Sequence, residues 1–190
     1  MKIIQDLLAY DGELRPVQPS PDHIWDGAAW QFSAERQIAA LTQMKTEIGI
    51  RLDAAADAAG QPYAGNELRA WEYQRAAADA QAYKDAGYKG DAPASVQAWA
   101  DAKSLSGKDA ADGILAKAMA ADQALAAIRA IRLKGKEAVR NATSLDAVQA
   151  AADSALAQLQ AVEAGAPDAS PADAAAKASL WRAPLKLFSR

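Results

Sequence analysis

The chain has 190 residues, of which 51% are hydrophobic, but about a quarter of all residues are Ala, so large apolar side chains are few and the core is thin. Its 21 basic and 24 acidic residues are too balanced for a strongly basic nucleic-acid binder or a polyacidic tail. Cys is absent, which excludes disulfides, zinc–thiolate sites and a Cys nucleophile.

Residues 1–32 differ from the rest of the chain in carrying three prolines and two turn signals, Asp11-Gly12 and Asp26-Gly27. Asp-Gly between apolar runs is typical of a short hairpin, because Gly accepts the positive φ of the tight turn. We expect two hairpins, which pair residues 7–10 with 14–17 and 23–25 with 29–32. So short a segment buries little surface, so it should lean on the helices or on another chain.

The first long helix is expected to begin after the N-cap Ser33 and to stop at Gly60 and Pro62. A second helix should begin after Asn66 and end at Gly87 in a left-handed turn. Both show apolar residues at helical spacing, which predicts one packed face on each. In the first helix these are Ile38, Leu41, Ile48, Leu52, Ala55 and Ala59; in the second, one side carries Leu68, Trp71, Arg75, Ala78 and Ala82.

A short helix should follow Pro93, with Val96, Trp99 and Ala100 on one face. Ser106 and Asp109 then form a capping box that opens the longest periodic run. We expect Gly135 to weaken the end of that helix. Its heptad-like seam, which could pair in trans or pack in cis on the helix that follows, consists of Ile114, Ala118, Ala121, Leu125 and Ile128.

A second capping box, Thr143 with Asp146, is expected to start the last helix. Leu145, Val148, Ala152, Leu156, Leu159 and Val162 repeat along it until Gly165. The predicted fold class is mostly α: Ala-rich helical hairpins, a bundle or a coiled coil, with a small N-terminal β-hairpin region and an extended C-terminal tail. We divide the chain into an attachment segment (1–32), a helical domain (33–165), a linker (166–179) and a docking segment (180–190).

The docking segment is dense in large apolar side chains, and the chain carries no acid from Ala174 onward. One interpretation is a peptide that enters a groove on a partner. The alternatives are an anchor on an anionic membrane surface and a segment that folds back onto its own helices. The predicted partner-binding residues are Leu180, Trp181, Arg182, Leu185, Lys186, Leu187 and Phe188.

Residues for catalysis are sparse. His23 is the single histidine, so neither a two-histidine metal site nor a Ser-His-Asp relay can form within one chain, and we expect it to serve a turn. The basic cluster Arg129, Arg132, Lys134, Lys136 and Arg140 is interpreted as a solvated helix face rather than a nucleic-acid site. Aromatic residues of the middle helices, Trp71, Tyr73, Tyr83, Tyr88 and Trp99, are expected to fill gaps between Ala-faced helices.

We therefore predict a non-enzymatic protein that binds no cofactor, metal or nucleic acid. No stretch approaches the roughly 20 uninterrupted apolar residues that cross a bilayer, so no stable membrane insertion is expected. Gln5 and Asp6 interrupt the N-terminal apolar run, which argues against a secretory signal.

Four stretches resemble the small tail-fibre assembly and tail-associated proteins of tailed bacteriophages. They are Trp25-Asp26-Gly27-Ala28-Ala29-Trp30, Gly60-Gln61-Pro62-Tyr63, Ala94-Ser95-Val96-Gln97-Ala98-Trp99-Ala100 and Ile128-Arg129-Ala130-Ile131-Arg132-Leu133-Lys134, within roughly residues 23 to 160. The resemblance implies a tail, baseplate or fibre component of the virion that is assembled in the host cytoplasm, or a fibre-assembly chaperone. The implied partners are other phage tail or fibre proteins, with a homo-oligomer or a large assembly as the expected state. A helical adaptor in the host cytoplasm is the alternative from another class.

Overall fold

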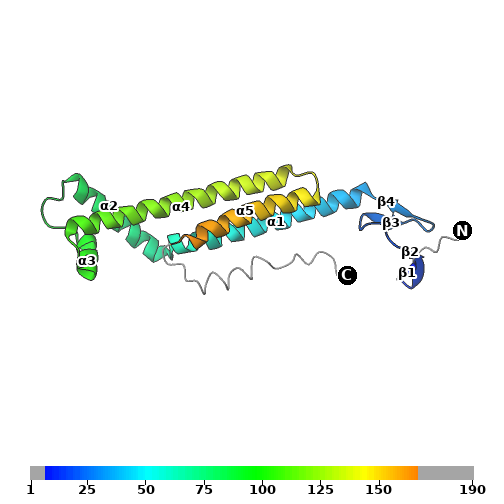
Figure 1. The fold of residues 1–190 in the computed structure, drawn as a ribbon, viewed down its shortest axis with the longest axis horizontal. Coiled ribbons are helices and arrows are strands. Elements are labelled where there is room, and N and C mark those ends of the chain that lie inside the picture. Colours follow the sequence, from blue (N-terminus) through cyan, green and yellow to red (C-terminus); the bar gives the residue numbers. More distant parts are fainter. Residues whose placement is uncertain (1–6, 167–190) are drawn as a thin grey trace.

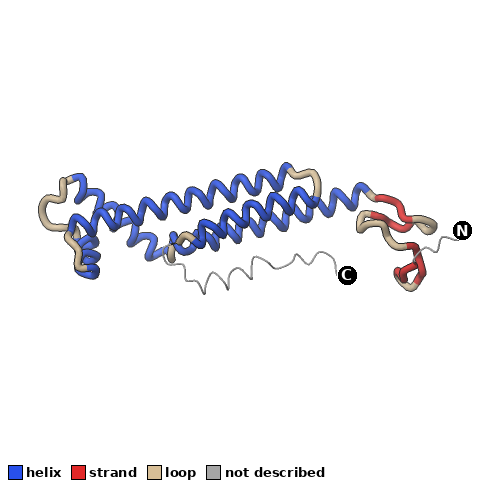
Figure 2. Tube along the Cα trace, in the orientation of Figure 1, coloured by secondary structure: helices blue, strands red, loops and turns tan. Residues whose placement is uncertain are grey.

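The computed structural model describes residues 7–166, which form an elongated, mostly helical molecule with small strands at one end (Figure 1). Figure 2 shows that the strands are confined to the N-terminal end of the described chain and that the rest is helical. The mostly α fold class with a small N-terminal β region is therefore confirmed. The elements are β1 (Leu7–Tyr10), β2 (Glu13–Pro16), β3 (His23–Trp25), β4 (Trp30–Phe32), α1 (Ala34–Ala64), α2 (Glu67–Asp85), α3 (Ala94–Lys103), α4 (Gly107–Asn141) and α5 (Leu145–Ala164).

The strands form two separate antiparallel pairs, β1 with β2 and β3 with β4, as the turn signals predict. Leu7 pairs with Pro16 in the first hairpin and His23 with Phe32 in the second. Asp11 and Gly12 both have positive φ (48° and 84°), the conformation that a two-residue hairpin turn requires. In the second turn, the Asp26 carboxylate accepts hydrogen bonds from the backbone N–H groups of Ala28 and Ala29, each at 2.8 Å.

Helix α1 begins as expected, because the Ser33 side chain accepts a hydrogen bond from the N–H of Arg36. The prediction that it stops at Gly60 and Pro62 is wrong, since the helix continues to Ala64 and is capped by Gly65. Gly60 is buried in the helix, where a Cβ would lie 3.6 Å from Leu125 of α4. Pro62 falls in the final turn, where its missing N–H removes one backbone hydrogen bond, and the next residue, Tyr63, packs on the main core.

The main core lies where α1, α5 and the C-terminal half of α4 run side by side as a three-helix bundle (Figure 1). Gly135 was expected to weaken the end of its helix, but α4 passes straight through it to Asn141. A Cβ at Gly135 would lie 2.7 Å from the Cβ of Ala155 and 3.4 Å from Leu52, so α1 and α5 both approach α4 closely at this glycine. The core residues are Met44, Ile48, Leu52, Ala55, Ala56, Ala59, Ile128, Val139, Val148, Ala152, Ala155, Leu156 and Leu159.

A second, smaller core lies where α2 and α3 pack on the N-terminal half of α4. Four of its five buried residues are alanines, namely Ala80, Ala100, Ala110 and Ala111, and the fifth is Val96. Tyr83, Tyr88 and Trp99 pack against it, as expected of aromatic residues between Ala-faced helices. Helix α4 is thus shared by two cores, and its 35 residues extend about 52 Å.

The connection from α4 to α5 differs by one residue from its prediction. The N-cap of α5 is Ser144, whose hydroxyl accepts a hydrogen bond from the N–H of Ala147, rather than Thr143. The N–H of Ala142 still closes the last turn of α4 on the carbonyl of Ala138, so Thr143 lies in the connection between the two helix caps. The Lys45 ammonium of α1 donates a 2.8 Å hydrogen bond to the carbonyl of Arg140, which places a cation at the C-terminal end of α4.

Candidate interaction surfaces

Side chains that could bind a metal or form a catalytic relay are not grouped together in the described residues. Among residues 7–166 there is no group of three or more His, Cys, Asp or Glu side chains that could hold a metal ion. His23 has a turn role, because its Nδ1 shares a 2.9 Å hydrogen bond with the Ser20 hydroxyl and its ring packs edge-on against Phe32. Within the same residues, no helix is both long and apolar enough to span a membrane.

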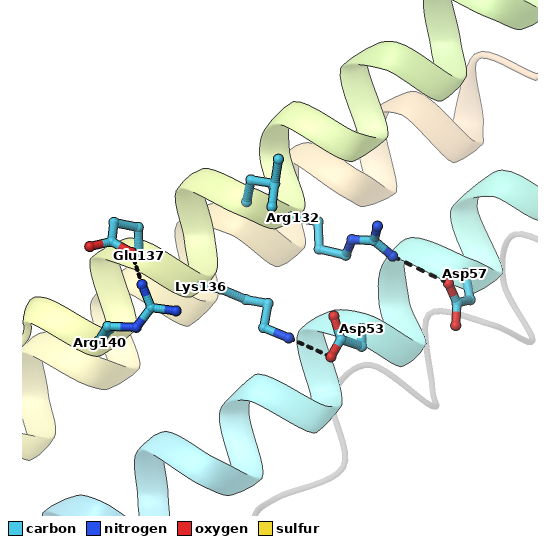
Figure 3. A pocket seen from close by; sticks show the side chains of 7 residues that line it. Asp53, Asp57, Arg132, Lys136, Glu137 and Arg140 are labelled. Carbon is cyan, nitrogen blue, oxygen red and sulfur yellow. Dashed lines mark hydrogen bonds and ion pairs between the residues drawn. The ribbon is translucent and has the colours of Figure 1, made fainter.

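A shallow groove between α1 and α4 contains most of the predicted basic cluster, now paired with carboxylates (Figure 3). Lys136 of α4 reaches across to Asp53 of α1 at 2.6 Å, and Arg132 reaches Asp57 at 3.7 Å. Arg140 pairs with Glu137 on its own helix. Arg132 and Lys136 therefore face α1 across the groove, whereas Arg129 and Lys134 do not line it.

Asp112 of α4 holds together the other end of the molecule. Its carboxylate accepts a 2.6 Å hydrogen bond from the Tyr88 hydroxyl and lies 3.0 Å from Lys108 and 3.3 Å from Lys84. The hydrogen bond from Tyr88, followed by that from Lys108, lowers the pKa of Asp112 to about 2 and raises those of both partners. Tyr88 has a φ of 58°, a conformation that its contacts with Asp112 and Tyr83 maintain. The cluster links the α2–α3 turn to α4, a structural role.

The two hairpins pack on each other through aromatic rings, and together we call them the hairpin head (residues 7–32). The ring of Trp30 lies edge-on to Tyr10 and Trp25, with centroids 5.2 Å and 5.4 Å away. The Trp30 indole N–H donates a 2.7 Å hydrogen bond to the carbonyl of Pro16, and the Arg15 guanidinium lies over Trp25. These contacts fix one hairpin against the other independently of the helix bundle.

The apolar residues around this aromatic centre point to solvent instead of into a core. Leu7, Leu8, Leu14, Val17, Ile24 and Phe32 are between 42% and 71% exposed, and Ile38 on the adjoining turn of α1 is 64% exposed. All four strands are edge strands, because within residues 7–166 each sheet has two strands. Exposed apolar side chains beside unpaired strand edges are typical of a surface that receives another chain. We call these seven residues the apolar rim of the head.

The second exposed apolar surface is the outer face of α2, and here the predicted packing is wrong. Leu68 and Trp71 are 66% and 57% exposed, and Tyr73 is exposed too, so none of the three fills a gap between helices. Helix α2 instead packs on α4 through Ala80. Nine residues separate Trp71 from Ala80, which at about 100° per residue puts them on opposite sides of the helix. We define the outer face by the residues predicted to pack, Leu68, Trp71, Arg75, Ala78 and Ala82.

The predicted seam of α4 is used within the chain at both of its ends. Ile114 packs against the smaller core, and Ile128 is buried in the main core with residues of α1 and α5. Between them, Ala118 and Ala121 are half-buried and Leu125 lies at the surface beside Gly60. The cis alternative, packing on the helix that follows, therefore holds for Ile128, whereas Ile114 packs within the chain against α2 and α3 instead. The predicted partner-binding residues 180–188, and the linker apart from Ala166, lie outside the described residues.

The described residues thus define an elongated helical protein with exposed apolar side chains at the hairpin head, on α2 and singly along the other helices. Comparison of the chain with protein-family models, curated proteins and solved structures gives no match. The sequence did not predict that Leu14, Phe32 and Trp71 of these interaction surfaces are exposed, because residues of these types are usually buried in a core.

Proposed function

We propose that the chain is a non-enzymatic structural protein of a bacteriophage tail, baseplate or tail fibre, assembled in the host cytoplasm and kept in the virion. The observation that carries the proposal is the apolar rim of the hairpin head, which leaves seven large side chains in solvent next to unpaired strand edges. The resemblance of residues 25–30 and three later stretches to phage tail-associated proteins supplies the class of assembly.

The head is built to receive another protein by strand addition. Its aromatic centre holds the two hairpins rigid, so little conformational entropy is lost when a partner binds. The edge of β1 offers backbone hydrogen-bonding groups, and the exposed Leu7 and Leu8 beside it supply apolar contacts. We therefore expect the partner to be another tail or fibre protein that contributes an extended, apolar strand.

Two other roles would use the same surface. A fibre-assembly chaperone would bind its partner during expression and be missing from the finished particle. A host adaptor of helical-bundle type would bind a host protein when no phage protein is present. The rod of helices behind the head, with its two Ala-rich cores and its ion-paired groove, suits a spacer in a permanent assembly.

The test is to replace Leu14 and Phe32 by Ser and to follow the variant through infection with a phage that encodes the chain. Mass spectrometry of purified virions should detect the wild-type protein and lose the head variant. Ile50→Ser is the matched control, because Ile50 is 67% exposed on α1, away from the head. Absence of the wild-type protein from mature particles would exclude the structural role, and equal incorporation of the head variant would exclude the rim as the attachment surface.

A further inference from the structure

We propose that residues 180–190 of the same chain cover the outer face of α2. The observation that prompts the proposal is an exposed Leu68 and Trp71 on the side of α2 that faces away from α4. The proposal commits to folding back, one of the alternatives open for the C-terminal segment, and it does not depend on the phage assignment.

The end of α5 places the C-terminal segment within reach of α2. The Tyr63 hydroxyl at the end of α1 donates a 2.7 Å hydrogen bond to the carbonyl of Val162, so the last turn of α5 lies beside the start of α2. Figure 1 shows the same meeting of the end of α5 with the α1–α2 junction. Residues 167–179 can extend about 43 Å, whereas the 19 residues of α2 extend about 28 Å, so the whole face is accessible.

A short tether also favours binding within one chain over binding between chains. Two sites joined by a tether of this length meet at an effective concentration in about the millimolar range. Copies of the chain in solution meet at micromolar concentration, so an interaction of modest affinity forms in cis first.

The chemistry of the segment matches the face. Residues 180–190 include the apolar side chains Leu180, Trp181 and Phe188, which suit a face that is bulky at Leu68 and Trp71 and small at Ala78 and Ala82. Glu67 and Glu72 of α2 have no ion-pair partner among the described residues. The chain from residue 174 onward carries four bases and no acid, and subtracting this +4 from the total of −3 leaves −7 for residues 1–173. Helix α2 itself is nearly neutral, so the electrostatic attraction at this face comes from pairing these bases with Glu67 and Glu72.

A second copy of the same face is a poorer occupant. Arg75 stands midway between Leu68 and Ala82, so pairing the face with itself puts Arg75 opposite Arg75 whether the helices run parallel or antiparallel. Two like charges held opposite each other in an otherwise apolar contact oppose association, whereas the bases of residues 180–190 have Glu67 and Glu72 of α2 to pair with. Within one chain, Arg75 instead stacks over the ring of Trp71, with its guanidinium carbon 5.8 Å from the centroid.

The absence of Cys makes the test direct, since Ser189→Cys introduces a single thiol for a spin label. In the labelled, ¹⁵N-enriched full chain, the amide signals of residues 67–82 should broaden, whereas those of the hairpin head should not. Lack of broadening on α2 would overturn the proposal. A mixture of ¹⁵N-enriched unlabelled chain with spin-labelled chain of natural isotope content should show no broadening, and broadening there would assign the contact to a second copy.

Variants of the face provide the control. Replacing both Leu68 and Trp71 by Ser should abolish the broadening, while the equally exposed Ile50→Ser should retain it. Neither site is packed against the other described helices, so far-UV circular dichroism should show unchanged helix content in each variant and after deletion of residues 180–190. Broadening that survives the double Ser substitution, or loss of helix on deletion, would place the segment elsewhere in the fold.

Discussion

Gly135→Ala should destabilise the protein, although the same substitution usually stabilises a helix. The new Cβ would lie 2.7 Å from the Cβ of Ala155, about 1 Å inside an ordinary carbon–carbon contact, and 3.4 Å from Leu52. Forcing apart helices in a packed core costs about 1–3 kcal/mol. Ala gains about 0.5–1 kcal/mol over Gly from helix propensity. The net expectation is a loss of up to about 2.5 kcal/mol in the free energy of unfolding, with a central value of about 1 kcal/mol.

Gly113→Ala is the matched comparison, because it lies in the same helix and a Cβ there would meet nothing within 4 Å. It should raise the free energy of unfolding by about 0.5–1 kcal/mol. Urea unfolding followed by circular dichroism at 222 nm measures both, and the two midpoints should move in opposite directions. Combining Gly135→Ala with Ala155→Gly should recover about 1 kcal/mol beyond additivity. Equal stabilisation by the two Gly→Ala substitutions would refute the close approach of α4 and α5.

Three further outcomes are expected. Asp112 has a pKa of about 2 against an ordinary 3.8, so its contribution to stability is complete above pH 3.8 and is lost as the pH falls towards 2. Asp112→Asn should therefore make the free energy of unfolding depend less on pH in that range. An unchanged pH dependence would contradict the Tyr88 contact. Lys136→Met should change the free energy of unfolding by less than about 1 kcal/mol, because its ion pair is solvent-exposed; a larger loss by urea titration would show the groove to be structural. Ser144→Ala should cost about 1 kcal/mol while Thr143→Ala stays within about 0.5 kcal/mol, and thermal unfolding that reversed this order would restore Thr143 as the N-cap.

The elements that the sequence predicts well are those specified by neighbouring residues. Ser33, Asn66 and Ser106 cap helices as expected, since each side chain bonds to a backbone N–H only three residues away. The positive φ of Gly87 ends α2 for the same local reason. One residue is enough to shift such a signal, as Ser144 beside Thr143 shows. The resemblance to phage tail proteins and the docking of residues 180–190 stay predictions.

The sequence by itself determined a mostly helical protein with hairpins at its start, because apolar spacing, caps and turns act over a few residues. Only the tertiary structure decided which apolar side chains are buried. Gly60 and Gly135 both lie inside continuous helices, and at Gly135 the close approach of Ala155, a residue distant in sequence, leaves no room for a Cβ. Leu68 and Trp71 have the spacing of a packed face but lie in solvent, because α4 packs on the opposite, alanine side of α2. Periodicity identifies a face, and only the neighbouring helices determine whether that face is covered.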